Sequence, residues 1–142
     1  MNIKQVIILR TKYPDGKGGT FSPRKGKLVA QGAHASMKIF FDRITSREID
    51  KEDESTAYFT FIGSLEMKEW IEGDFKKIVV GCNSEDTLIM CYNKAQEMEI
   101  PCALIEDNGL TEFKGVKTKT ALAIGPADSD KIDKITKELK LL

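Results

Sequence analysis

The sequence predicts an α/β protein: a three-layer α/β/α sandwich built on a mixed, mostly parallel four-stranded sheet. Four short apolar segments rich in β-branched residues have the composition of buried strands, at residues 5–9, 77–82, 102–106 and 120–125. Helical patterns of crossover length separate the first three, which places helices on both faces of the sheet. About a dozen loop residues and no helix separate the last two strands, and such a direct return favours antiparallel pairing.

The first half of the chain is predicted to hold one long helix. Ser22 has the chemistry of an N-cap and Pro23 suits the first helical position, so we expect the helix over residues 23–45. The residues expected on its buried face follow helical spacing: Leu28, Gly32, Ala35 and Ile39. Residues 45–55 are charged and are predicted to form an exposed connection. Residues 56–62 alternate polar and apolar side chains, as a short edge strand does.

Three shorter helices are predicted further along the chain. Ser64 is expected to cap a short helix in which Trp70 packs internally rather than stacking on a base. Ser84, followed by two acidic residues, is the predicted N-cap of the next helix. Pro126 is expected to stop the last strand, and a closing helix follows over residues 128–139.

The composition indicates one domain, residues 1–142, of a cytoplasmic protein. Hydrophobic residues make up 41% and charged residues 31% of the chain, which is ordinary for a soluble globular protein. The sequence has neither an apolar run long enough for a membrane span nor the apolar core of a signal peptide. One histidine and three scattered cysteines, Cys82, Cys91 and Cys102, make a poor set of metal ligands, so we expect no metal and no cofactor. Reduced, mainly buried thiols are the expectation for these cysteines.

Charge is balanced overall but uneven along the chain. The formal net charge is zero, whereas residues 1–27 carry seven basic side chains against Asp15 alone. Acidic residues gather instead between Glu48 and Glu54. A protein that meets phosphate on one face would have this distribution, although many other proteins share it.

Polar residues at helical spacing mark a candidate functional face on the long predicted helix. Spacings of four, three and four residues place on one side of it Lys27, Gln31, His34 and Lys38. Small residues lie between them, so this helix can approach another element closely. An ordinary solvated face is the alternative. Asp107 ends the third strand, and ligands of α/β sheets gather at the carboxyl ends of strands, so Lys27 and Asp107 can converge on one edge.

The residues also resemble a known family. Three blocks occur in order: Lys25-Gly-Lys27 with Ala30-Gln-Gly-Ala-His-Ala35, Pro101-Cys-Ala-Leu-Ile-Glu-Asp107, and Thr120-Ala-Leu-Ala-Ile-Gly-Pro126. Together they are similar to the type-2 peptidyl-tRNA hydrolases, the archaeal and eukaryotic type, over nearly the whole chain. The resemblance implies hydrolysis of the ester bond between a peptide and the 3′-terminal ribose of tRNA. Peptidyl-tRNA is then the partner, with no membrane partner and with a homodimer as an open alternative.

The family's functional residues can be transferred by position. The resemblance implies catalytic roles for Lys27, Asp107, Thr111 and Thr120. It also aligns Gln31 and His34 with polar helix positions of the family, where we expect them to bind substrate. Contacts with the acceptor end of tRNA are expected from the basic N-terminal segment and the later loop, namely Arg24, Lys25, Lys114 and Lys117. Leu110 stands where the family commonly has arginine, and residues 11–24 and 46–64 look expanded, which bears on substrate handling.

Ester hydrolysis needs an attacking water, help with its proton and stabilisation of the oxyanion. Asp107 could orient or deprotonate that water, and Lys27 could stabilise the oxyanion or keep Asp107 ionised. Attack by a threonine hydroxyl is the alternative, with His34 as a base. A non-catalytic RNA- or protein-binding module on the same scaffold is a rival function. A serine esterase and a nucleotide-binding domain are disfavoured, because the sequence contains no Gly-X-Ser-X-Gly, GxGxxG or Walker motif.

Overall fold

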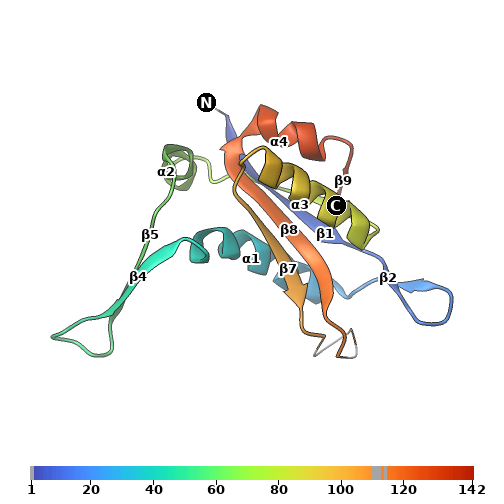
Figure 1. Cartoon of the computed structure of the whole chain (residues 1–142), viewed down its shortest axis with the longest axis horizontal. Helices are drawn as coiled ribbons and strands as arrows, with labels where there is room; N and C mark the ends of the chain where they lie inside the picture. Colours follow the sequence, from blue (N-terminus) through green and yellow to red (C-terminus); the bar gives the residue numbers. More distant parts are fainter. Residues whose placement is uncertain (1, 110–112, 114) are drawn as a thin grey trace.

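The computed structural model describes residues 2–109, 113 and 115–142, and it places a five-stranded sheet between two layers of helices (Figure 1). The sheet order is β7–β8–β1–β6–β9. The strands are β1 (Ile3–Arg10), β6 (Lys77–Cys82), β7 (Cys102–Asp107), β8 (Thr118–Asp128) and β9 (Lys140–Leu141). The helices are α1 (Lys25–Phe41), α2 (Leu65–Glu72), α3 (Glu85–Glu97) and α4 (Ser129–Thr136). The predicted three-layer α/β class is confirmed.

The prediction of a four-stranded, mostly parallel sheet needs correction. Of the four predicted strands, β1, β6 and β7 point the same way, but β8 runs in the opposite direction between β1 and β7. Among the described strands of this sheet, only β1 and β6 form a parallel pair. The fifth strand, β9, pairs antiparallel with β6, with Lys140 opposite Gly81 and Leu141 opposite Val80. Two residues are too few to carry a periodic pattern, so no sequence pattern predicts β9.

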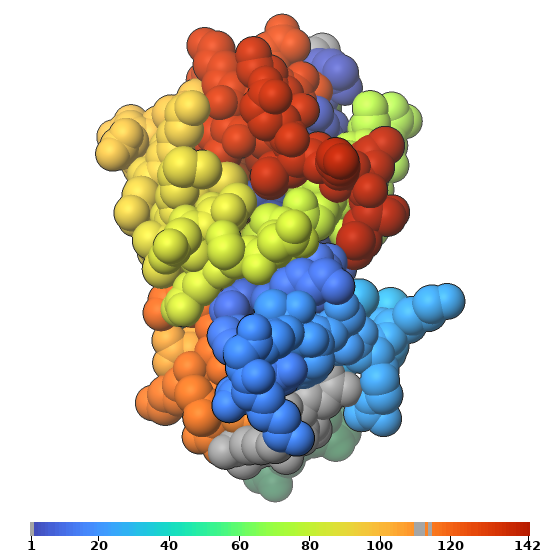
Figure 2. Space-filling model, turned by 90° about the vertical axis from the view of Figure 1, so that its right-hand side faces the viewer, coloured from blue at the N-terminus to red at the C-terminus, as the bar shows by residue number. Residues whose placement is uncertain are grey.

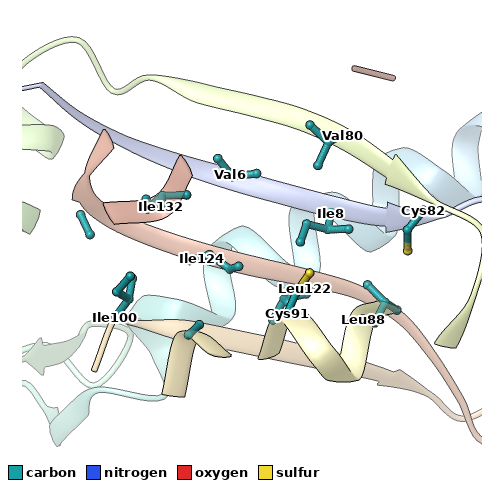
Figure 3. Close-up of a cluster of buried hydrophobic side chains, with 12 residues drawn as sticks. Val6, Ile8, Val80, Cys82, Leu88, Cys91, Ile100, Leu122, Ile124 and Ile132 are labelled. Carbon is teal, nitrogen blue, oxygen red and sulfur yellow. The ribbon is translucent and has the colours of Figure 1, made fainter. Parts of the chain in front are cut away.

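The core lies on both faces of the sheet, because β1 is buried on both sides. Val6 and Ile8 face α3 and α4, where Figure 3 shows them with side chains of β6, β8 and both helices. Ile7 and Leu9 point to the opposite face, toward α1 and α2. Burying each such side chain contributes about 1.5–3 kcal/mol. The continuous apolar run was therefore a correct indication of a two-sided strand.

The sequence predicts that the last long strand stops at Pro126, but in the structure this strand continues. β8 continues to Asp128, and Pro126 lies where the pairing of β8 with β1 shifts register, between Lys4 and Val6 of β1. A proline lacks the N–H that a regular ladder requires, and a register shift is a position that tolerates this loss. Strand β8 therefore runs past its proline into the closing helix α4.

Two serine caps are confirmed, and one predicted helix start is wrong. The Ser64 hydroxyl accepts from the Met67 amide at 3.1 Å, and the Ser84 hydroxyl accepts from the Thr87 amide at 3.2 Å. Helix α1 begins at Lys25 rather than at residue 23, because Arg24 keeps an extended backbone with ψ at 155°. Trp70 is buried, and its indole N–H donates to the Lys76 carbonyl at 2.8 Å, so the predicted packing role is confirmed.

Two hairpins stand outside the main sheet. The first pairs β2 (Tyr13–Pro14) with β3 (Thr20–Phe21), between β1 and α1. The second pairs β4 (Ile44–Ile49) with β5 (Ala57–Phe61) and extends away from the sheet (Figure 1). Part of the region predicted as an exposed connection is thus strand β4, and residues 57–61 are an edge of this hairpin rather than of the main sheet. The charges of this segment obscured its alternating pattern.

No helix in the described part of the chain is long and apolar enough to cross a membrane.

The three cysteines form no disulfide; Cys82 and Cys91 are buried, as expected, and Cys102 is partly buried in β7. Burial raises the pKa of each thiol, which keeps it protonated near neutral pH.

Candidate active site

The end of β7 and the first turns of α1 bring a carboxylate and an ammonium group into contact. Lys27 Nζ donates to Asp107 Oδ2 at 2.7 Å, and Gln31 Nε2 donates to the same oxygen at 2.8 Å. Lys27 and Gln31 lie four residues apart on α1 and therefore on one helical face. The expected convergence of the helix and the strand end is confirmed by these contacts.

Gln31 links this carboxylate to the neighbouring strand. The Thr120 hydroxyl of β8 donates to Gln31 Oε1 at 2.6 Å, so Gln31 accepts from Thr120 and donates to Asp107. Gln31 is 3% and Thr120 1% exposed. Because the Thr120 proton is used in this buried hydrogen bond, the geometry suits a positioning group better than a group that meets water.

The turn after β7 completes the setting of the carboxylate. The Gly109 amide donates to Asp107 Oδ1 at 2.6 Å. Gly109 has φ at 79°, and a Cβ there would lie 2.6 Å from backbone atoms of Val116, so this position requires glycine. Asp107-Asn-Gly109 is a favourable turn sequence, and the same turn also supplies a hydrogen bond to the candidate site.

The surroundings keep Asp107 ionised. Partial burial alone raises the pKa of this carboxyl, but Lys27 opposes it through its hydrogen bond and its charge, together with the Gly109 amide and Gln31. The net result is a pKa below the ordinary value of 3.8. The Lys27 and Asp107 side chains are each 13% exposed, so the pair is mostly buried but still reaches solvent.

Aromatic side chains that no sequence motif marks lie beside this pair. Lys27 Nζ lies 5.5 Å from the centre of the Phe113 ring, and Phe113 packs on Tyr13 with ring centres 4.6 Å apart. Phe21 contacts both rings. The guanidinium of Arg10 lies 4.3 Å over the Tyr13 ring. No periodic pattern marks these residues, because they come from a hairpin and from a loop.

The structure leaves several predicted site residues outside the cluster around Asp107. His34 is exposed, and its side chain has no hydrogen-bond partner among the described residues, so nothing in this geometry supports it as a base. Arg24, Lys25 and Lys117 are exposed, as tRNA contacts must be. The remaining predicted residues, Thr111 and Lys114, and the substituted position Leu110 lie outside the described residues.

The arrangement offers a fixed carboxylate beside an ammonium group. Across the described ranges, no group of three or more His, Cys, Asp or Glu side chains is placed to hold a metal ion. An ionised carboxylate can orient water, and an adjacent cation can stabilise a developing oxyanion. Together these groups can assist the addition of water to a carbonyl.

Comparisons with known proteins identify the family of the chain. The family model described as "Peptidyl-tRNA hydrolase PTH2" matches residues 3–142. A peptidyl-tRNA hydrolase of Methanocaldococcus jannaschii is 39% identical over 142 residues, covering 99% of this chain and all of that protein. One of Saccharolobus islandicus is 35% identical over 140 residues, covering 99% of both chains.

A solved structure supports the fold alone. A protein of unknown function from Agrobacterium tumefaciens strain C58 superposes with a TM-score of 0.53 at 15% identity, covering all of this chain and 98% of that one. The family match and the archaeal relatives, by contrast, extend over nearly the whole sequence and include the segments that carry Lys27 and Asp107. The chain therefore belongs to the peptidyl-tRNA hydrolase PTH2 family.

Proposed function

We propose that this chain hydrolyses the ester bond between a peptide, or an N-blocked amino acid, and the 3′-terminal ribose of tRNA. The products are free tRNA and the released peptide acid. The observation that carries the proposal is the shielded Lys27–Asp107 pair at the end of β7, in a chain of the peptidyl-tRNA hydrolase family.

Asp107 is proposed to orient the attacking water. Its Oδ2 accepts from Lys27 and Gln31, while Oδ1 accepts from Gly109 and keeps a lone pair for one further donor. Because the pKa of this carboxyl is lowered, it is a weak base, so orientation and electrostatics contribute more than complete proton removal. Water adds to the ester carbonyl, and the bond to the ribose oxygen then breaks as that oxygen takes up a proton.

Lys27 is proposed to stabilise the charge that develops on the carbonyl oxygen. Its ammonium group lies 2.7 Å from Asp107 Oδ2, and a cation at this position can stabilise a developing oxyanion. Gln31 and Thr120 are proposed as positioning residues that fix the Asp107 carboxylate. Thr111 is kept as a catalytic residue on the resemblance of the sequence alone.

Substrate binding is proposed to be largely electrostatic. Arg24, Lys25 and Lys117 are exposed cations that can meet phosphates of the acceptor end; Lys114 and His34 are proposed as further contacts from the family resemblance. We propose a cytoplasmic location on the basis of this function on tRNA.

Deacylation of N-acetyl-aminoacyl-tRNA by the purified chain tests the function directly. We expect hydrolysis by the natural chain, unchanged by a metal chelator, and a loss of at least about 100-fold in kcat for Asp107→Asn. Asp42→Asn is the matched control, because Asp42 pairs with Lys38 in an exposed salt bridge at the far end of α1. If the chain binds tRNA without cleaving the ester, the hydrolase proposal is wrong.

We also propose a homodimer in which the arm, residues 44–61, lies on a second copy. Every residue of β5 is exposed, including Tyr58 and Phe59, and a two-stranded hairpin is marginal without a partner. A second copy offers an apolar groove of about 840 Å³ along α1 and β6, lined by Leu28, Val29, Met37, Phe75, Val79 and Leu142. Lys77 also lines this groove, whereas the arm carries five acidic and two basic residues.

Sedimentation velocity tests the dimer. We expect the natural chain to sediment as a dimer and Phe59→Glu to sediment as a monomer, because a carboxylate cannot enter an apolar groove without a large desolvation cost. A monomer at all concentrations of the natural chain would contradict the proposal, as would an unchanged dimer of the variant.

A further inference from the structure

A pocket of about 680 Å³ opens beside the Lys27–Asp107 pair, between the β2–β3 hairpin and the start of β8. Its lining is largely aromatic and apolar: Tyr13, Pro14, Phe21, Phe113 and Val116, with Asp15, Gly16, Lys17 and Thr118. Figure 2 shows the hairpin, drawn in blue, in the lower half of the visible surface. The contacts of the Lys27–Asp107 pair do not explain why a pocket of this size lies next to it.

Three rings form one wall of the pocket. Tyr13 and Phe113 are buried, at 3% and 7% exposure, and pack together with ring centres 4.6 Å apart. Phe21 is only partly buried and lies 5.7 Å from Tyr13 and 6.1 Å from Phe113 between ring centres. The two buried rings therefore support Phe21, which keeps part of its surface for a ligand. Such a supported ring is suited to stacking on a flat group.

The ring of Phe113 separates the pocket from the proposed reaction centre. Phe113 lines the pocket, and its ring centre is 5.5 Å from Lys27 Nζ, which is 2.7 Å from Asp107 Oδ2. In the proposed substrate, the terminal nucleobase and the esterified oxygen are attached to the same ribose. A base in the pocket would therefore leave the ester near Lys27 and Asp107.

The charges around the pocket favour a nucleotide over an amino-acid side chain. Arg10 lies over the Tyr13 ring, Lys17 lines the pocket, and Lys12 and Lys117 are exposed nearby in the sequence. The Asp15 carboxylate is the opposing charge, and it already accepts from the amides of Lys17 and Gly19 in the hairpin turn. A nucleotide brings a phosphate with its base, whereas the C-terminal residue of a peptide that is still esterified to tRNA carries no charged carboxylate next to its side chain.

We propose that the β2–β3 hairpin and Phe113 form the binding pocket for the 3′-terminal nucleobase of tRNA, with Phe21 as the stacking platform. The proposal rests on the proposed function, since it names the part of the substrate that enters this pocket. Thr118 supplies a hydroxyl at the pocket that donates to the Val116 carbonyl at 2.9 Å and can accept from the edge of the base. Phe21 is a specificity-determining residue in this scheme rather than a catalytic one.

The experiment compares Phe21→Leu and Phe21→Trp with Phe41→Leu, a control at an exposed phenylalanine near the end of α1. Substrates are N-acetyl-glycyl-tRNA and N-acetyl-leucyl-tRNA. Loss of one stacking contact is expected to raise KM about tenfold in Phe21→Leu for both substrates, with kcat changed less than twofold. Phe21→Trp restores the flat surface and is expected to keep the natural KM, as is Phe41→Leu.

Direct binding separates this proposal from the hydrolase function. Adenosine 5′-monophosphate, titrated into the chain and followed by NMR, is expected to shift resonances of Tyr13 and Phe113, and to shift them less in Phe21→Leu. An unchanged KM in folded Phe21→Leu, or a change that depends on the amino acid, would overturn the nucleobase assignment. Absence of nucleotide binding would overturn it too, even if hydrolysis is normal; failed hydrolysis with normal nucleotide binding would overturn only the function.

Discussion

Replacing Lys27 by methionine tests the ion pair on which the proposed chemistry depends. Methionine keeps much of the apolar side-chain volume and removes the ammonium group. The variant loses the 2.7 Å contact to Asp107 Oδ2, while Gln31 and Gly109 continue to donate to the carboxylate. The substitution therefore removes one charge, its hydrogen bond to Asp107 and its contact with the Phe113 ring.

The expected loss of stability is moderate. A hydrogen bond to a charged group contributes about 1.5–3 kcal/mol, and breaking a fully buried ion pair costs about 3–5 kcal/mol. Both side chains of this pair are 13% exposed and Asp107 keeps two other donors, so we expect the lower figure, about 2 kcal/mol. For a chain of 142 residues this is a fall of about 6–10 °C in Tm, and the variant stays folded at 25 °C.

The expected loss of activity is much larger. Removing one group that stabilises an oxyanion lowers kcat by about 100- to 1,000-fold. Deacylation of N-acetyl-aminoacyl-tRNA at saturating substrate measures this effect, with circular dichroism as the check on folding. Lys38→Met is the matched control, since Lys38 belongs to the same helix and pairs with Asp42 in an exposed salt bridge. Near-normal kcat in a folded Lys27→Met variant would refute the reasoning.

Three further predictions follow from the same contacts. Because the pKa of Asp107 is lowered, its contribution to stability is present above pH 3.8 and is lost as pH falls through the lower folded value; urea titrations of the natural chain and Asp107→Asn should converge there. Gln31→Leu should lower kcat about tenfold by freeing the carboxylate, and it should cost about 1–3 kcal/mol because it leaves the Thr120 hydroxyl buried without its acceptor; an unchanged urea midpoint would contradict this. Affinity for tRNA, measured by filter binding, should fall as the salt concentration rises. Lys117→Ala should reduce the slope of log affinity against log salt concentration by about 0.7–0.9. Equal slopes in the variant and the natural chain would show that Lys117 does not contact tRNA.

The candidate site shows where local sequence information is sufficient. Lys27 and Gln31 share a helical face because their spacing is four residues, and Asp107 ends a strand whose apolar run is plain in the sequence. The rule that strand carboxyl ends and their following loops meet at one edge then predicted the convergence. These features could be predicted because each depends on periodicity or on chain order alone.

The corrections share one physical cause. The hairpin strand β4 was hidden by its charges, Pro126 was read as a stop, and β9 has only two residues. In each case pairing with another strand decides the structure, and local propensity carries little weight against it; β4 pairs with the nearby β5, whereas β8 and β9 pair with distant strands. Pro126 lies within β8 because the partner strand shifts register there, which no local pattern announces.

The sequence by itself determined the α/β class, the two-sided burial of β1 and the two residues of the ion pair, because these follow from patterns within single elements. Only the tertiary structure decided that Gln31 joins Thr120 to Asp107, and that Tyr13, Phe21 and Phe113 form a pocket beside Lys27. The contacts of Gln31 with Asp107, of Gln31 with Thr120 and of Tyr13 with Phe113 join residues about 75 to 100 positions apart. Such contacts depend on how packed elements meet in space, and the order of residues along the chain does not encode that directly.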